Sequence, residues 1–219
     1  MPANQEKTLK KTLLDGGAVI GTLVNFASTA MMRYAGDAGF DFVIIDNEHG
    51  PMGIETTEAM VITAEAAGIV PLVRVAANQH APIMRMLDVG ARGVHIPQIN
   101  DREDALRAVR NIKFPPIGTR GLALSVRANH FGSAHADEFI RQNNEETLVI
   151  AQIETANGVG NLADILTVEG LDVIFVGPLD LSHSLGVAGQ LDNETYLDAV
   201  NEIFSRAMEA KKILGIYVS

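Results

Sequence analysis

Short apolar runs rich in β-branched residues recur along the chain and alternate with segments of helical periodicity. Seven runs predict buried parallel strands, at residues 18–24, 42–45, 70–75, 93–99, 148–153, 173–176 and 213–218. Helical patterns lie between most of them, at residues 56–67, 82–89, 101–112 and 194–211. This alternation predicts the α/β class. A strand-to-strand step of roughly 25 residues, with no GxGxxG after the first strand, favours a (β/α)8 barrel of the TIM type over a dinucleotide-binding sheet.

Two parts of the chain depart from that repeat. Residues 113–147 are polar and rich in proline and glycine, so we expect a functional loop excursion there and no further strand-helix unit. The sequence also stops inside the seventh predicted strand. Because a closed barrel of this type needs eight strands, we expect the eighth strand and the C-terminal helix to be lacking. No linker or shift in composition divides the chain, so residues 1–219 are expected to form a single barrel domain.

Composition narrows the possible functions. The formal net charge of −10 disfavours nucleic acid as a partner, since no strong basic patch offsets it. The chain has no cysteine, which excludes disulfides, thiolate metal sites and a cysteine nucleophile. Residues 1–12 are polar, and no stretch reaches about 18 uninterrupted apolar residues, so neither a signal peptide nor a membrane span is expected. These features favour a cytoplasmic enzyme whose metal ligands, if any, are oxygen or imidazole.

Polar residues follow several of the predicted strands, which is where catalytic groups gather in such barrels. Gln152 and Glu154 are two apart on one strand and therefore share a face, and Asp180 follows the next strand. The two carboxylates are expected to converge and to hold Mg²⁺ or Mn²⁺, with water or substrate oxygens completing the coordination. A bound 2-oxo acid would then have its carbonyl polarised. The alternative for the carboxylates is a salt-bridged barrel floor.

Arginine and histidine candidates complete this hypothetical site. Arg74 ends the third strand and would stabilise the negative charge of an enolate. His49 follows the second strand and could exchange a proton near neutrality if a carboxylate orients its ring. Asp88, near the end of the helical segment 82–89, is the candidate partner, with a helix-terminal role as the alternative. His95, on a strand, is expected to be packed and not reactive.

Five segments carry a family resemblance. They are FVIIDNEHGP at 42–51, GARGVHIPQ at 90–98, GTRG at 118–121, QIET at 152–155 and GPLDLSHSLG at 177–186. Together and in this order they resemble the HpcH/HpaI aldolases, over roughly residues 10–219. The resemblance implies a (β/α)8 barrel, a homo-oligomer (trimer or hexamer), and reversible addition of pyruvate to an aldehyde without a Schiff-base lysine.

The resemblance also implies a role for each candidate residue. Glu154 and Asp180 would hold a divalent metal ion, Mg²⁺ or Mn²⁺ with Co²⁺ as a further candidate. Arg74 would stabilise the pyruvate enolate, and His49 with Asp88 would handle the proton of the aldol hydroxyl. The pyruvate site would be lined by Gln152, Gly177, Pro178 and Leu179.

Three functions stay open on the sequence. The first is a class II aldolase that cleaves or makes 4-hydroxy-2-oxo acids of the 2-keto-3-deoxy type. The second is a citryl- or malyl-CoA lyase or an oxaloacetate decarboxylase with the same metal and Arg74, although no convincing basic pocket for a CoA ester is visible. The third is a non-catalytic binding or assembly subunit. Residues 122–131, LALSVRANHF, differ from the small-residue loop expected of sugar-acid aldolases, which leaves the aldehyde undefined.

Overall fold

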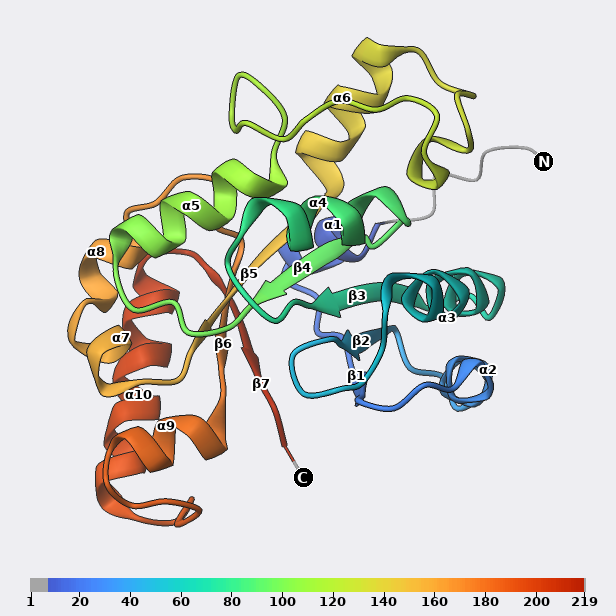
Figure 1. Ribbon diagram of the computed structural model, residues 1–219. Helices are drawn as coiled ribbons and strands as arrows, with labels where there is room; N and C mark the ends of the chain where they lie inside the picture. The colour runs from blue at the N-terminus through green and yellow to red at the C-terminus, as the bar shows by residue number, and fades with distance from the viewer. Residues whose placement is uncertain (1–7, 219) are drawn as a thin grey trace.

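The computed structural model describes residues 8–218 and is built around one parallel β-sheet (Figure 1). Its seven strands are hydrogen-bonded in chain order, each to the next. The alternation of strands and helices along the sequence predicts this order. The strands are β1 (Gly21–Val24), β2 (Phe42–Asp46), β3 (Val70–Arg74), β4 (Gly93–Ile96), β5 (Leu148–Ile153), β6 (Val173–Val176) and β7 (Ile213–Ile216). Each predicted strand is thus confirmed.

Helices connect the strands and cover the outer face of the sheet, with α2 and α3 on one side of Figure 1 and α7, α8 and α10 on the other. The longer helices are α2 (Thr29–Asp37), α3 (Ile54–Ala66), α4 (His80–Asp88), α5 (Arg102–Ile112), α6 (Ala136–Glu146) and α10 (Glu194–Glu209). The shorter ones are α1 (Leu9–Leu14), α7 (Ala156–Gly160), α8 (Leu162–Leu166), α9 (Pro178–Ser184) and the 3₁₀ turn η1 (Arg127–Asn129). Asp101 is the N-cap of α5, and its carboxylate accepts the Asp104 amide at 2.8 Å.

Two apolar clusters hold these layers together. The larger lies between the sheet and the outer helices and includes Ile45, Val73 and Ile153, which point outward from their strands. The smaller lies inside the curl of the sheet and includes Ile44 and Leu72, which point inward. Leu9 of α1 packs into this inner cluster, so α1 covers part of the sheet's concave side.

The segment 113–147 is more ordered than we predicted. It contains η1 and the 11-residue helix α6 within a long irregular connection. Lys113 explains part of this order, because its buried ammonium group donates to the carbonyls of Asn144 and Thr147, both at 2.7 Å. The expectation of a loop excursion was therefore wrong for residues 136–146.

The observed architecture is an α/β fold with a curled, seven-stranded parallel sheet, consistent with a TIM-barrel-like arrangement. In the part of the chain that the structure describes, no helix is both long and apolar enough to cross a bilayer. The polar segment predicted at residues 1–12 falls largely outside the described residues, which begin at residue 8.

His95 is an unusual polar residue inside this sheet. It is 1% exposed, it packs edge-on against Phe175 with ring centroids 4.6 Å apart, and neither ring nitrogen has a hydrogen-bond partner among the described residues. Burial, assisted by the positive charge of Arg74, lowers its pKa from 6.5 to about 3. The ring is thus packed in its neutral form, as expected.

This histidine should make the protein sensitive to acid. Its folded pKa of about 3 lies below the unfolded value of 6.5, so the unfolded state binds more protons between these values. Stability is present above pH 6.5 and is lost as the pH falls toward 3, by about 1.4 kcal/mol per pH unit. We expect His95→Leu to show a shallower decline in unfolding free energy, measured by urea denaturation from pH 7.5 to 4.5.

The matched control is His80→Gln, which changes an exposed histidine at the start of α4. Its unfolding free energy should depend on pH as steeply as that of the wild-type protein. Equal slopes for His95→Leu and the wild-type protein would contradict a buried neutral His95.

Candidate active site

The parallel strands bring their carboxyl ends to one edge of the sheet, and this edge holds the polar residues predicted to act together. The register pairs Asp46 with Arg74 across β2 and β3, and Gln152 with Phe175 across β5 and β6. Side chains at matched positions of neighbouring parallel strands point to the same face. The edge therefore collects charged groups above the inner apolar cluster.

Arg74 and Asp46 form the buried ion pair of this edge. Arg74 donates to both carboxylate oxygens, from Nε at 2.9 Å and from the terminal guanidinium nitrogen at 2.7 Å. Burial alone raises the pKa of Asp46, but the hydrogen bond and the charge of Arg74 outweigh that effect and lower it. The same carboxylate accepts the amides of Glu48 and His49, which fixes the turn after β2.

Glu48 and His49 extend from that turn. The Glu48 carboxylate lies 3.3 Å from Arg74 Nε, but one of its oxygens is buried without a hydrogen-bond partner among the described residues. Burial raises the pKa of Glu48. The His49 ring lies 3.8 Å from the same carboxylate, and its side chain is 60% exposed. His49 is therefore accessible from solvent at the mouth of the site.

Glu154 is a buried carboxylate of the site that forms no ion pair with the described residues. It follows β5, is 3% exposed, and accepts the backbone amide of Gln98 at 2.7 Å and the side-chain amide of Gln152. Burial is the main cause that raises its pKa to about 7, and the negative charges of Asp180 and Glu48 add to it. The predicted proximity of Gln152 and Glu154 is confirmed by their hydrogen bond.

The β6–α9 connection closes the other side of this carboxylate. A Cβ at Gly177 would lie 2.7 Å from both the Glu154 oxygen and the Gln152 nitrogen, so a larger residue there would force these two side chains to shift. Pro178 begins α9 and is buried, whereas Leu179 is 64% exposed. Asp180 lies in the first turn of α9 and is exposed.

The donor set fits a hard divalent cation. No group of three or more histidine, aspartate or glutamate side chains in the described residues could hold a metal by itself. The Glu154 and Asp180 pair would need water or substrate oxygens as further ligands, which is the mode typical of Mg²⁺. The carboxylate of Glu154, buried without a cation, is the group that a metal ion would neutralise.

Among the described contacts within this chain, His49, the predicted partner, is not bonded to Asp88. Its carboxylate accepts a hydrogen bond at 2.9 Å from Arg120, whose side chain is fully buried. The physical reason is the direction of α4. A helix that follows a parallel strand returns toward the strand's amino end, so the last residue of α4 lies away from the edge that carries His49.

Sequence reasoning passed over Asp46, Glu48 and Gln98 as site residues. The signal for Asp46 was present, because an acid and an arginine at the ends of successive strands come into register. Gln98 gave no signal, since its backbone amide contributes and its side chain is exposed.

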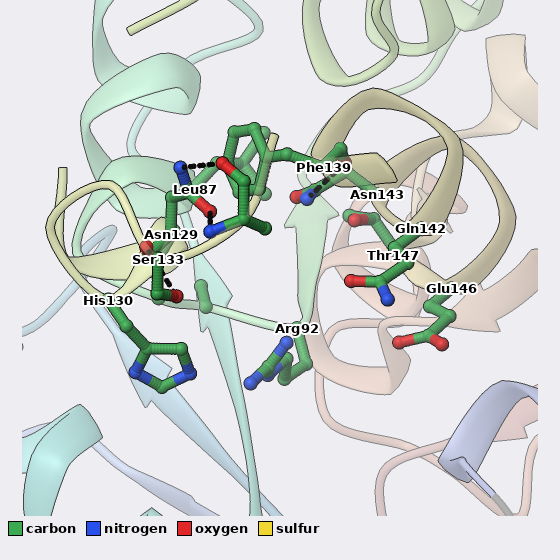
Figure 2. A pocket seen from close by; sticks show the side chains of 14 residues that line it. Leu87, Arg92, Asn129, His130, Ser133, Phe139, Gln142, Asn143, Glu146 and Thr147 are labelled. Atoms are coloured by element: carbon green, nitrogen blue, oxygen red, sulfur yellow. Dashed lines mark hydrogen bonds between the residues drawn. The ribbon is translucent and has the colours of Figure 1, made fainter. Parts of the chain in front are cut away.

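A cavity of about 160 Å³ lies elsewhere, between α6 and the residues that precede β4 and β5. Figure 2 shows its lining by Arg92, His130, Ser133, Gln142 and Glu146, among others. Because Arg92 and Thr147 directly precede strands, the cavity is at the amino edge of the sheet. It is therefore separate from the candidate site.

The buried ion pair should matter for stability. Removing one partner of such a pair leaves an uncompensated charge, which typically costs 3–5 kcal/mol. Because Glu48 still faces Arg74, we expect Asp46→Asn to lower the unfolding free energy by about 3 kcal/mol. Urea denaturation of both proteins at pH 7.5 measures this difference in unfolding free energy.

The control is Asp37→Asn, which breaks an exposed pair with Arg33 in α2. It should change the unfolding free energy by less than about 0.5 kcal/mol. If both variants were equally stable, the Arg74–Asp46 pair would not hold the turn after β2.

Comparisons with known proteins agree with this geometry. The chain is 37% identical over 197 residues to the 5-keto-4-deoxy-D-glucarate aldolase of Salmonella paratyphi C (strain RKS4594), covering 90% of this chain and 76% of that protein. The crystal structure of an HpcH/HpaI aldolase from Desulfitobacterium hafniense DCB-2 superposes with a TM-score of 0.92 at 32% identity, covering 98% of this chain and 83% of that one.

A third similar protein has a different activity in its name. The citrate synthase SbnG superposes with a TM-score of 0.89 at 34% identity, covering 97% of this chain and 82% of that one. The sequence model described as HpcH/HpaI aldolase/citrate lyase matches residues 20–219. The predictions of the family and of an enzyme with lyase chemistry are thereby confirmed, and the chain belongs to the HpcH/HpaI aldolase/citrate lyase family.

Proposed function

We propose that this protein is a divalent-metal-dependent class II aldolase that reversibly cleaves 4-hydroxy-2-oxo acids to pyruvate and an aldehyde. The observation that carries the proposal is that Glu154 interacts electrostatically with both Asp180 and the guanidinium group of Arg74 at one sheet edge. The resemblance to the HpcH/HpaI aldolases implies dependence on a divalent metal ion. The likeness to 5-keto-4-deoxy-D-glucarate aldolase supports a 2-keto-3-deoxy acid as the substrate.

The proposed roles follow from position and charge. Glu154 and Asp180 hold Mg²⁺, Mn²⁺ or Co²⁺, which when bound supplies Lewis-acid polarisation of the 2-oxo group. Arg74 is fixed by Asp46 and provides a permanent positive charge for the enolate oxygen. The pyruvate site is lined by Gln152, whose side-chain oxygen is buried without a hydrogen-bond partner among the described residues, and by Gly177, Pro178 and Leu179.

His49 is proposed to move the proton of the aldol hydroxyl. Its exposed ring at the mouth of the site is accessible to a substrate that extends beyond the pyruvate half. Glu48, 3.8 Å from the ring, is the carboxylate that faces it within this chain. Asp88 is engaged by Arg120 here and is not assigned that role.

A second candidate function rests on the likeness to a citrate synthase. Citryl- or malyl-CoA lyase chemistry, or oxaloacetate decarboxylation, would use the same two carboxylates and Arg74 with a different partner for the enolate. Competition by a CoA ester distinguishes this candidate from the aldolase. A non-catalytic binding or assembly subunit is distinguished by a lack of any turnover.

Further proposals concern the whole molecule. We propose that the curled sheet belongs to a (β/α)8 barrel, that residues 1–219 form one domain, and that the protein acts in the cytoplasm as a trimer or hexamer on small molecules. The parallel order of β1 to β7 supports the barrel. Composition supports the absence of nucleic-acid partners.

Solvent deuterium exchange into the methyl group of pyruvate tests the enolate-forming site without a choice of aldehyde. We expect exchange, followed by proton NMR, with Mn²⁺ or Mg²⁺ and none with a chelator. Glu154→Gln should slow it at least about 100-fold, because the Lewis acid contributes several kcal/mol. Glu209→Gln, an exposed change at the end of α10, is the control that should exchange normally. A metal-independent rate would argue against the proposal.

Replacement of His49 should separate the two halves of the reaction. We expect His49→Gln to slow aldol cleavage about 10²–10⁴-fold, the usual contribution of a general base. Pyruvate methyl exchange should fall by less than about 10-fold, because His49 acts on the hydroxyl proton. His183→Gln, an exposed change on α9, is the control. Equal losses of exchange and cleavage would assign His49 a different role.

A further inference from the structure

The backbone of Gln98 adopts a conformation that side chains disfavour. Its φ of +53° places it in the left-handed region, where residues other than glycine, asparagine and aspartate are uncommon. The Gln98 side chain is exposed and so does not explain the conformation by packing. A strained residue of this kind persists only where its surroundings fix it, and such residues cluster at functional sites.

The strained backbone directs one hydrogen bond at the candidate metal ligand. The amide of Gln98, just after β4, donates to one carboxylate oxygen of Glu154 at 2.7 Å, while the side chain of Gln152 donates to the other. The two donors approach from different strands, so the carboxylate plane cannot rotate without losing one of them. The next residue, Ile99, donates its amide to the Gln152 carbonyl at 3.2 Å, which ties the Gln98 peptide to β5.

Asn100 holds this backbone in place from the other side. Its side-chain nitrogen donates to the Gln98 carbonyl at 2.9 Å, and its side-chain oxygen accepts from the hydroxyl of Thr155, the residue after Glu154. Its own amide donates to the Asp104 carboxylate at 3.0 Å, and its carbonyl accepts from Asn161 at 2.9 Å. Asn100 therefore links the loop after β4, through Gln98, to the segment that follows Glu154, through Thr155 and Asn161.

We infer that Gln98 and Asn100 form a positioning unit that orients the Glu154 carboxylate for a divalent metal ion. The inference rests on the metal site of the proposed function. Neither residue is placed in contact with the metal or the substrate. Their effect is to fix a ligand before the metal arrives, as outer groups around metal ligands do when they hydrogen-bond a ligating carboxylate.

The experiment is a Mn²⁺ titration of the full chain by calorimetry and electron paramagnetic resonance, without substrate. We expect Gln98→Val to bind Mn²⁺ at least about 10-fold more weakly, because a β-branched residue is a strong outlier in the left-handed region. Asn100→Ala should lose about 10-fold as well, because the Gln98 carbonyl is no longer held.

Two matched variants separate positioning from general damage. Gln98→Ala removes only an exposed side chain and should bind Mn²⁺ within about 3-fold of the wild type. Asn78→Ala removes another loop asparagine, which donates to the Asp104 carbonyl at 2.8 Å and is not bonded to Gln98 or Glu154. It should leave Mn²⁺ affinity unchanged even if the melting temperature falls.

Each outcome decides a different statement. Weak binding by Gln98→Val and Asn100→Ala, with normal binding by both controls, supports the positioning unit. Wild-type affinity in folded Gln98→Val and Asn100→Ala, with loss in Glu154→Gln, overturns the inference and leaves the proposed metal site intact. Wild-type protein that binds no Mn²⁺ overturns both.

Discussion

The site depends on an imbalance of charge at the carboxyl edge of the sheet. Asp46, Glu48, Glu154 and Asp180 act on one another electrostatically there, and the guanidinium group of Arg74 faces the first three of them. Its two-point hydrogen bond satisfies Asp46 and leaves the other carboxylates only partly compensated. Burial of a charged carboxylate without a paired cation costs free energy, and this cost raises the pKa of Glu154. A divalent cation at Glu154 and Asp180 would remove it.

The hydrophobic pattern was sufficient to predict the strands but not all of the helices. The strands are short apolar runs, and the central strands β4 and β5 are buried on both faces, so the signal lies in neighbouring residues of the chain. Helix α6 is different, since Phe139 is the one buried residue of this fully described helix. Its position depends on Lys113 and on the side chain of Asn144, which hydrogen-bonds Phe114. Such tertiary contacts leave no periodic pattern to find.

The same distinction applies to the site. Residues at strand ends, such as Arg74 and Glu154, were predictable because parallel strands must bring their carboxyl ends to one edge. Asp88 was predicted to orient His49, but it ends α4, whose last residue lies toward the opposite edge of the sheet, and within this chain it pairs with Arg120. Gln98 could not be found at all, since its contribution is a backbone amide in a left-handed conformation that the side chain does not indicate.

The two halves of the proposed substrate face different environments, and this bears on specificity. The pyruvate half is proposed to lie against buried groups, Gln152 and Glu154, which hydrogen bonds and the close approach of Gly177 hold in one arrangement. The mouth is formed by exposed side chains, His49 and Leu179. Buried polar groups reject a ligand that cannot pair with them, whereas exposed groups remain solvated and discriminate less. We therefore expect strict selection of the 2-oxo acid and broad acceptance of aldehydes.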